Sequence, residues 1–195
     1  MNYQECIDNI RDLGFSDDDE IEEFGELVPN SINRAITEIN LNVAPIIERY
    51  ELTVDETDTG YMYVTMTDVD ENFLEFADNP VTFEENGKEV YRRFSDYDIE
   101  AEDTIVINTD DVKGSFRIFY KAAHEKFTGA ERELREELPL PLKAHHLVPL
   151  IASYYVWMED EPAKAAQYYN LYEQRKNDYI EQATKPKGTF WPGGI

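Results

Sequence analysis

The sequence predicts an α+β protein with a helical bundle from both chain ends, a β-rich insertion subdomain and an extended C-terminal arm. Apolar residues recur with a helical period near the N-terminus, change to a period of two from Ile47, and return to a helical period after Pro141. A chain of 195 residues suits one domain, or one domain with an insertion. We expect N-terminal helices of the bundle over 1–46, an acidic β-rich insertion over 47–121, a connecting loop and C-terminal helical hairpin over 122–183, and the arm over 184–195.

The N-terminal segment predicts three helices. The first covers Asn2–Leu13, where apolar residues repeat at three- and four-residue spacing, and Gly14 follows as a C-cap candidate. Ser16 then precedes four acidic residues, a pattern typical of an N-cap and a first helical turn, so we expect a short second helix up to Phe24. A third helix covers about Pro29–Asn42. Its apolar face holds Ile32, Ala35, Ile36 and Ile39.

The middle of the chain predicts five or six strands. Tyr50, Leu52 and Val54 alternate with polar residues, and further runs of aromatic and β-branched residues follow. Asn86-Gly87 between two apolar runs is typical of a tight hairpin turn. Residues 111–114 are expected to form a turn between the last two strands. The expected strands cover roughly 47–54, 61–66, 81–83, 90–91, 104–107 and 115–120.

The C-terminal part predicts two helices in an antiparallel hairpin. Pro139 and Pro141 keep the residues before them out of the helical region. A long apolar segment over 146–158 ends before Pro162, which suits the first position of a new helix that runs to about Ala183. We expect this last helix to pack through Ala165, Tyr168, Tyr169, Tyr172 and Tyr179. The remaining residues are rich in proline and glycine and predict the irregular arm.

The charge of the chain is unevenly distributed. The net charge is −24, and residues 48–111 alone carry twenty acidic and four basic residues. Such a surface argues against a protein that reads a nucleic-acid sequence, because that binding depends on phosphate neutralisation by Lys and Arg. A solvated, soluble surface is the plain explanation of these acids. The acids of 17–23 or of 48–111 are also candidates for the wall of a DNA passage. Such a wall would repel DNA of like charge and so would not bind it tightly.

The sequence contains no recognisable reaction centre. His145 and His146 are adjacent and would point about 100° apart on a helix, and no cysteine or further histidine stands at zinc-site spacing around them. Cys6 is the one cysteine and reads as a small core residue, so no intrachain disulfide is possible. Neither a phosphate-binding glycine loop nor a calcium loop is present. We therefore expect a protein that is not an enzyme and has no metal or cofactor. A start without signal-peptide features indicates a cytosolic chain.

The segment 147–158 is apolar on almost every side, which predicts a helix buried on more than one face. One face meets the bundle. The other face either meets a second copy of the chain or is enclosed by a bundle in which this helix is central. The candidate subunit-packing residues are Leu147, Leu150, Ile151, Tyr154, Tyr155 and Trp157.

Four stretches carry a resemblance to a known family. Leu147–Glu161 and Lys164–Tyr172 resemble the closing helices of tailed-bacteriophage head–tail adaptor (connector) proteins. Phe24–Pro29 and Ile32–Asn40 resemble the early helices of that family, and the β-rich insertion between the helical halves is similar as well. The matching motifs are packing motifs, and the pattern covers most of the chain. The large acidic β-rich region departs from the smaller members of the family.

The resemblance implies a structural virion component. Its subunits form a ring, commonly of twelve copies, that docks beneath the portal protein, receives a stopper or tail protein and lets DNA pass without sequence-specific binding. The implied location is the head–tail junction of the virion, with the host cytoplasm as the site of assembly. Family members often use an extended C-terminal arm against the portal. Here the arm offers Lys185, Lys187, Phe190 and Trp191 as docking residues.

Two alternatives stay open beside this expectation. The protein could be an acidic DNA mimic that occupies a host nucleic-acid-binding protein, in which case its acids would be regularly spaced on one face and it would be a monomer or dimer. A ring subunit requires an apolar lateral interface instead. For the arm, the alternative to docking is that Phe190 and Trp191 fold back onto their own bundle.

Overall fold

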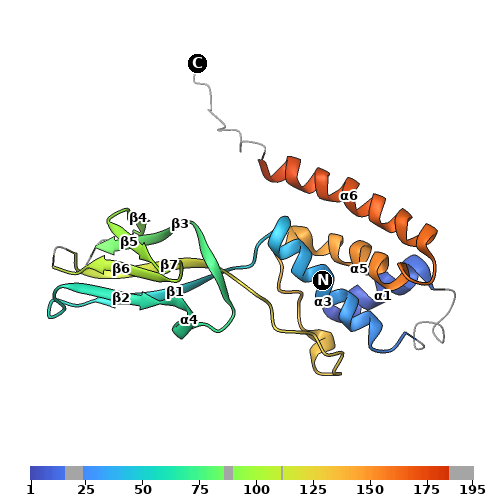
Figure 1. Ribbon diagram of the computed structural model, residues 1–195, viewed down its shortest axis with the longest axis horizontal. Helices are drawn as coiled ribbons and strands as arrows, with labels where there is room; N and C mark the ends of the chain where they lie inside the picture. Colours follow the sequence, from blue (N-terminus) through green and yellow to red (C-terminus); the bar gives the residue numbers. More distant parts are fainter. Residues whose placement is uncertain (16–23, 86–89, 111, 185–195) are drawn as a thin grey trace, which may run out of the picture. The chain divides into compact units, whose positions relative to one another are not determined.

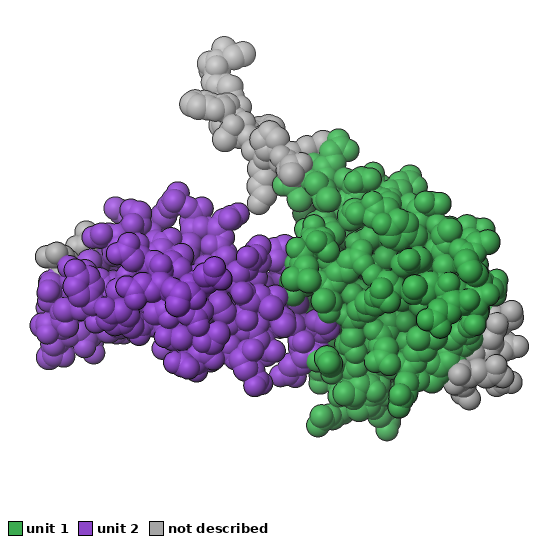
Figure 2. Space-filling view, viewed as in Figure 1, with its two compact units in different colours: residues 1–44, 126–195 green, residues 45–125 purple. Residues whose placement is uncertain are grey.

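The computed structural model describes residues 1–15, 24–85, 90–110 and 112–184, and it is a mixed α+β structure, as the sequence predicts (Figure 1). The chain divides into two compact units. The helical unit combines residues 1–44 with 126–195, and the β unit comprises residues 45–125 (Figure 2). Both chain ends thus belong to the helical unit.

Helices α1 and α3 differ in how their N-terminal ends are capped. Helix α1 (Tyr3–Gly14) has a reciprocal cap, in which Asn2 accepts the Glu5 N–H and the Glu5 carboxylate accepts the Asn2 N–H. Helix α3 (Leu27–Asn42) begins two residues before the predicted start at Pro29. Proline is tolerated there because N–H groups in the first turn of a helix have no intrahelical partner. The expected apolar face of α3 is confirmed, since Ile32, Ala35, Ile36 and Ile39 are all buried.

Helix α5 (Val148–Trp157) contacts three other helices of its unit: α1, α3 and α6 (Pro162–Thr184). Because it is apolar on every side, it can be enclosed from several directions at once. Two short 3₁₀ helices, η1 (Glu133–Arg135) and η2 (Leu142–Leu147), lie in the connection before it. Asn33 holds this connection to α3, donating to the Phe127 carbonyl at 2.7 Å and accepting its N–H at 2.9 Å.

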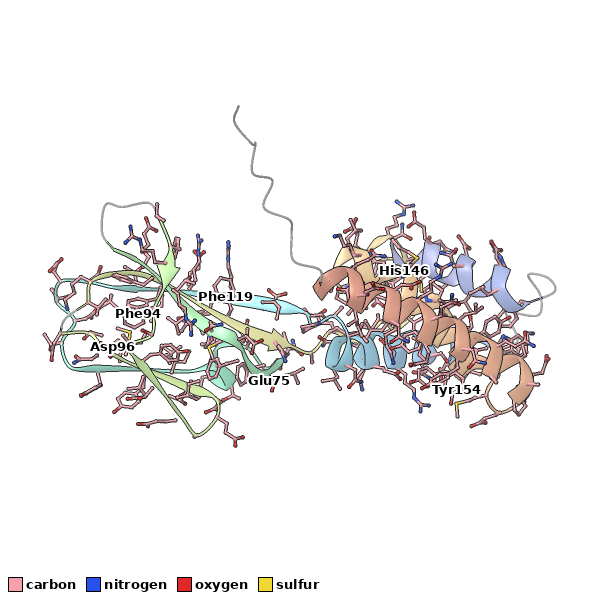
Figure 3. The ribbon with its side chains drawn as sticks, turned by 90° about the horizontal axis from the view of Figure 1, so that it is seen from above. Glu75, Phe94, Asp96, Phe119, His146 and Tyr154 are labelled. Atoms are coloured by element: carbon pink, nitrogen blue, oxygen red, sulfur yellow. The ribbon has the colours of Figure 1, made fainter. Side chains whose placement is uncertain are left out.

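Helices α5 and α6 form the predicted antiparallel pair. Trp157 at the end of α5 meets Lys164 near the start of α6, while His146, just before α5, lies near Tyr179 in the last third of α6. Figure 3 shows His146 and Tyr154 lying near opposite parts of α6. Ala165, Tyr168 and Tyr172 are buried as expected, and Tyr179 is partly buried. Tyr169 is 39% exposed, although its ring still packs on Tyr154 of α5 at 5.2 Å between centroids. Adjacent helical residues point about 100° apart, so Tyr168 and Tyr169 cannot share one narrow buried face.

The β unit contains two antiparallel sheets. The four-stranded sheet has the order β1 (Ile47–Val54), β7 (Gly114–Ala122), β3 (Phe73–Glu85) and β4 (Arg92–Arg93). The three-stranded sheet has the order β2 (Tyr61–Thr65), β6 (Thr104–Asn108) and β5 (Tyr97–Glu100), and the short helix α4 (Met66–Val69) follows β2. Both sheets contribute to one core. Its fully buried members include Met66, Val81, Ile105, Ile107, Phe116 and Ile118.

Several strand predictions need correction. The expected strand at 90–91 is wrong, because β3 pairs with 92–93 and places Phe83 opposite Arg92. Phe94 sets this register: its ring packs on Phe83 at 5.7 Å and Phe116 at 5.2 Å between centroids. The expected turn at 111–114 includes Asp111, which lies outside the described residues, and Gly114 already begins β7. β6 and β7 belong to different sheets, so this connection is not a hairpin. The Asn86-Gly87 turn and most of the expected second helix lie outside the described residues.

Candidate functional site

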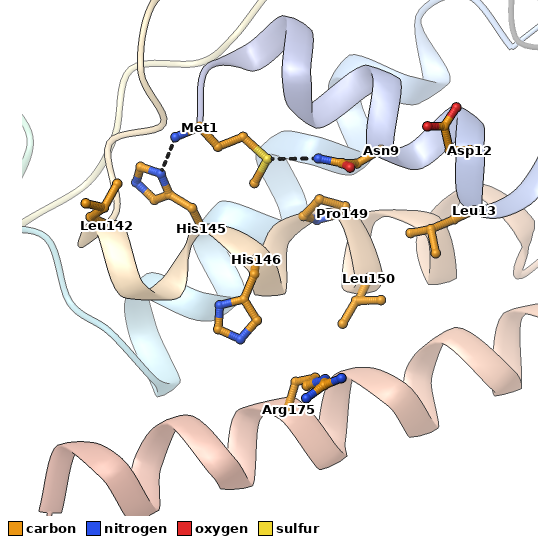
Figure 4. A pocket seen from close by; sticks show the side chains of 10 residues that line it. All are labelled: Met1, Asn9, Asp12, Leu13, Leu142, His145, His146, Pro149, Leu150 and Arg175. Atoms are coloured by element: carbon orange, nitrogen blue, oxygen red, sulfur yellow. Dashed lines mark hydrogen bonds between the residues drawn. The ribbon is translucent and has the colours of Figure 1, made fainter.

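A groove of about 670 Å³ opens on the surface of the helical unit (Figure 4). Four segments that are distant in sequence form its walls: Met1 with α1, the 3₁₀ helix η2, the start of α5, and α6. The residues that line it are Met1, Asn9, Asp12, Leu13, Leu142, His145, His146, Pro149, Leu150 and Arg175.

Local geometry explains how each wall presents its residues. Asn9, Asp12 and Leu13 stand three and four positions apart on α1 and therefore occupy one helix face. Pro141 precedes η2, and the Ala144 N–H donates to its carbonyl at 2.7 Å, which closes the tight turn that carries Leu142 and His145. The groove thus collects side chains from a helix face, a 3₁₀ turn and two further helices.

His145 is a structural residue at the edge of this groove. Its Nδ1 lies 2.9 Å from the Met1 ammonium and its Nε2 lies 2.7 Å from the Leu140 carbonyl oxygen. An ammonium donates and a carbonyl accepts, so the tautomer that suits both partners has Nδ1 as the acceptor and Nε2–H as the donor. Both ring nitrogens are therefore engaged. His145 is buried and ties the start of the chain to the turn before α5.

The groove is apolar at its centre and mixed in charge at its rim. Leu142 is 73% exposed, Leu13 is also exposed, and Leu150 is partly buried. Asp12 and Arg175 bring opposite charges to the rim (Figure 4). Figure 4 shows Leu142 at one end of the groove and Leu13 at the other. Exposed leucines in a concave surface are typical of a site that buries an apolar partner segment. The arrangement is therefore suited to binding driven by apolar burial and oriented by a few polar groups.

The structure separates the predicted subunit-packing residues into two groups. Leu147, Ile151, Tyr155 and Trp157 are buried within the helical unit itself. Leu150 lines the groove, and Tyr154 is partly exposed, with its ring 5.2 Å from that of Tyr169. Of the predicted residues, Leu150 and Tyr154 are therefore the two with side-chain surface left for a second chain. The arm residues Lys185, Lys187, Phe190 and Trp191 lie outside the described residues.

Tyr155 is held by a polar contact inside the unit. Its hydroxyl donates to the Glu38 carboxylate of α3, and the Arg34 guanidinium lies 3.9 Å from the centre of its ring. Burial, reinforced by the Glu38 carboxylate, raises the pKa of Tyr155 well above its ordinary value. The phenol therefore stays protonated as a donor, and Tyr155 joins α5 to α3.

Sequence reasoning missed most of the groove. Leu13 ends the expected first helix and stays exposed, and nothing in the local pattern marks Leu142 or Arg175. The one usable signal is the Leu-Pro alternation before Leu142, which keeps residues 138 and 140 out of a helix and places an apolar side chain directly after that stretch.

The acidic clusters of the β unit show no assembled cation site. Asp70 accepts the Tyr120 hydroxyl at 2.8 Å, which commits one of its oxygens to the fold. Across residues 1–15, 24–85, 90–110 and 112–184, no group of three or more His, Cys, Asp or Glu side chains is placed to hold a metal. Over the same residues, no helix has the length and apolar character needed to cross a membrane.

Comparison with protein-family models finds no match for this chain, and comparison with curated proteins finds none either.

Proposed function

We propose that this protein is a head–tail adaptor of a tailed bacteriophage, a structural and non-enzymatic virion component that forms a ring under the portal and joins the capsid to the tail. The observation that carries the proposal is the leucine-lined groove on the helical unit. Its walls include the start of α5, which belongs to the stretch whose sequence resembles the closing helices of that family.

In this proposal the helical unit is the bundle that builds the ring, and the β unit is an insertion into it. The segment of a neighbouring copy that fills the groove is expected to be apolar, because Leu13, Leu142 and Leu150 would otherwise remain in water. Burying apolar surface contributes roughly 25 cal/mol per Å², so a few leucines at a repeated interface give a substantial total.

The charge distribution supports contact through this unit. The helical unit, residues 1–44 and 126–195, carries 21 acidic and 11 basic residues, whereas the β unit, residues 45–125, carries 21 acidic and 7 basic residues in a shorter stretch. Two copies therefore repel each other less through the helical unit than through the β unit. Residues 48–111, with twenty acidic and four basic residues, would repel their equivalents in a neighbouring copy at short range.

The acidic surface and the arm have separate roles in the proposed assembly. An acidic wall repels DNA only over about a Debye length, roughly 8 Å at physiological salt, so it lets DNA pass without binding it. The arm docks on the portal, with Phe190 and Trp191 as apolar anchors and Lys185 and Lys187 for an acidic neighbour. A stopper or tail protein completes the junction on the other side.

Two matched substitutions test the groove. Leu142→Asp places a charge in the groove, whereas Leu41→Asp places one on α3 at a leucine that is 63% exposed and does not line it. Native mass spectrometry is expected to detect a closed oligomer for the unchanged protein and for Leu41→Asp, and smaller species for Leu142→Asp. Both leucines are exposed, so both variants should unfold at about the same temperature as the unchanged protein.

If all three proteins had the same oligomer mass, the groove would not be part of the interface between copies. A monomer or dimer at every concentration would contradict the ring and favour the acidic DNA mimic instead.

A further inference from the structure

The three-stranded sheet turns one face to the core and one away from it. Residues paired directly across antiparallel strands lie on the same face. The row Val64–Ile105–Ile99 includes two core residues, so the rows on either side of it face outward. These outward rows are Tyr63–Val106–Asp98 and Thr65–Thr104–Glu100, and Tyr61 opposite Asn108 extends the face by one more row. Val106 and Thr104 of the central strand are buried, so the exposed side chains of this face stand on the two border strands.

Two tyrosines dominate one side of this outward face. Tyr61 is 65% exposed and Tyr63 is 59% exposed, and both stand on β2 with one residue between them. Strand β2 lies at one border of the sheet and pairs with β6 alone among the described residues (Figure 1). A border strand leaves half of its backbone N–H and C=O groups unpaired.

Strand β2 lacks the usual protection of a border strand. Natural border strands are commonly guarded by charged side chains, which discourage pairing with another chain. The other three border strands of the β unit follow this rule: β1 contains Glu48, Arg49 and Glu51, β4 is Arg92-Arg93, and β5 contains Asp98 and Glu100. The sequence of β2, Tyr-Met-Tyr-Val-Thr, contains no charge. Its border is therefore open to an additional strand.

The charges beside the tyrosines are acidic and uncompensated. Asp98 and Glu100 are exposed, and within the part of the chain that the structure describes neither forms an ion pair. The three strands of this sheet contain no lysine or arginine. The four-stranded sheet differs, because Arg117 lies 3.0 Å from Glu51 and Lys121 lies 2.6 Å from Glu75. The outward face of the three-stranded sheet thus presents two exposed carboxylates, Asp98 and Glu100, with no cation among its own three strands.

The spacing of this face suits a cationic side chain. Adjacent strands lie about 4.8 Å apart, so the tyrosines of β2 and the carboxylates of β5 are separated by roughly 10 Å, with Val106 between them. Val106 itself is buried, but a guanidinium or ammonium can lie on the exposed ring of Tyr63 at one side of it, and another can pair with the exposed Asp98 carboxylate at the other side. The β unit already contains one such contact, since the Arg117 guanidinium lies 3.6 Å from the centre of the Tyr91 ring.

We propose that this tyrosine–carboxylate face and the open border of β2 bind an extended, basic segment of a partner protein, which adds a strand beside β2. Backbone pairing with β2 gives the segment its direction, and its arginine or lysine side chains meet the tyrosines and carboxylates. Charge disfavours the β unit of a second copy as the occupant, since residues 45–125 carry 21 acidic and 7 basic residues. The proposal goes beyond the adaptor function and does not depend on it.

The test uses the full chain and a fluorescent ten-residue peptide of alternating arginine and threonine. Fluorescence anisotropy at physiological salt should detect binding of this peptide. A peptide of the same sequence that is N-methylated at every second residue keeps the charge but cannot complete a strand ladder, and it should bind at least tenfold more weakly. A peptide with glutamate in place of arginine should not bind.

Paired variants locate the site. Asp98→Asn with Glu100→Gln, and separately Tyr61→Ser with Tyr63→Ser, should each weaken binding at least tenfold. The control, Glu51→Gln with Glu75→Gln, removes the same number of negative charges from the four-stranded sheet and should change binding less than threefold. Equal weakening by test and control variants, equal binding of the methylated peptide, or no binding of the arginine peptide would each overturn the proposal. Because the readout is peptide binding, it is independent of whether the chain forms a ring.

Discussion

Trp157 is enclosed by side chains from several elements of the helical unit. Its ring lies 4.9 Å from that of Phe15 and 5.1 Å from that of Phe24, and the Lys164 ammonium lies 3.2 Å from its centre. The same ammonium donates to the Gly14 carbonyl at 2.5 Å. The indole is therefore packed against two aromatic rings and one ammonium, and the residue that lies against its nitrogen must be small.

Gly14 is that residue, and Gly14→Ala should destabilise the protein. A Cβ at this position would lie 2.6 Å from Trp157 Nε1 and 3.1 Å from the Tyr168 hydroxyl oxygen. Alanine would gain up to about 1 kcal/mol of helix propensity, but overpacking costs about 1–3 kcal/mol and should prevail. Urea unfolding measures the change. Trp157→Phe removes the nitrogen, so it should reduce the cost of Gly14→Ala; an unchanged cost in that background would refute the clash.

Cys6 provides a pH-dependent test of the same core. Burial raises the pKa of its thiol from about 9 to about 12, so the folded state holds this proton more tightly than the unfolded state. The contribution of Cys6 to stability is complete below pH 9 and is lost as the pH rises from about 9 towards 12. Cys6→Ala should therefore lose less thermal stability than the unchanged protein between pH 8 and pH 11. Parallel losses for the two proteins would contradict the assigned burial.

At the scale of single elements, α6 shows how a helical stripe is narrower than its sequence indicates. Tyr168, Tyr169 and Tyr172 look alike in the sequence, yet Tyr172 is fully buried while Tyr169 packs sideways on Tyr154. Their burial differs because each residue points in a different direction around the helix axis and meets different neighbouring helices. The direction can be read from the sequence, whereas the neighbours cannot.

The two tyrosines should respond differently to truncation. Tyr172→Ala leaves a cavity in the helical unit and should cost about 3–5 kcal/mol of unfolding free energy, in the range of other large buried aromatics. Tyr169→Ala removes a partly exposed ring and one aromatic contact and should cost about 1 kcal/mol or less. Chemical unfolding of both variants gives the comparison. Equal costs would mean that the buried face of α6 is assigned wrongly.

Local sequence patterns predicted some strands of the β unit and failed for others. Alternation located β1, β2 and β7 because one face of each meets the core. The sequence pattern did not predict β5, where Tyr-Asp-Ile-Glu lies at the border of a sheet and only Tyr97 packs on the core. The pattern also misplaced β4, because the register of β4 depends on the packing of Phe94. Both strands owe their positions to contacts made by residues far away in the sequence.

At the scale of the whole molecule, the sequence predicted the α+β class and the helix pairs better than it predicted the candidate site. The fold class follows from the spacing of apolar residues, which can be read within each segment of the sequence alone. The groove depends on Leu13, Leu142, Leu150 and Arg175 coming together from four segments, and no pattern within one segment records that meeting. The open border of β2 is different, because its uncharged sequence is visible at once but becomes meaningful only when its place in the sheet is known.

The proposed role assigns contact with other copies to the leucine-lined groove and contact with the portal to the C-terminal arm, and the most direct test is to image the assembly itself. Electron microscopy of the purified protein mixed with portal-bearing phage heads should show a closed ring of subunits on the axis of the portal, with a central opening wide enough for DNA. Heads whose portal stays bare, or protein bound without a ring on that axis, would contradict the account.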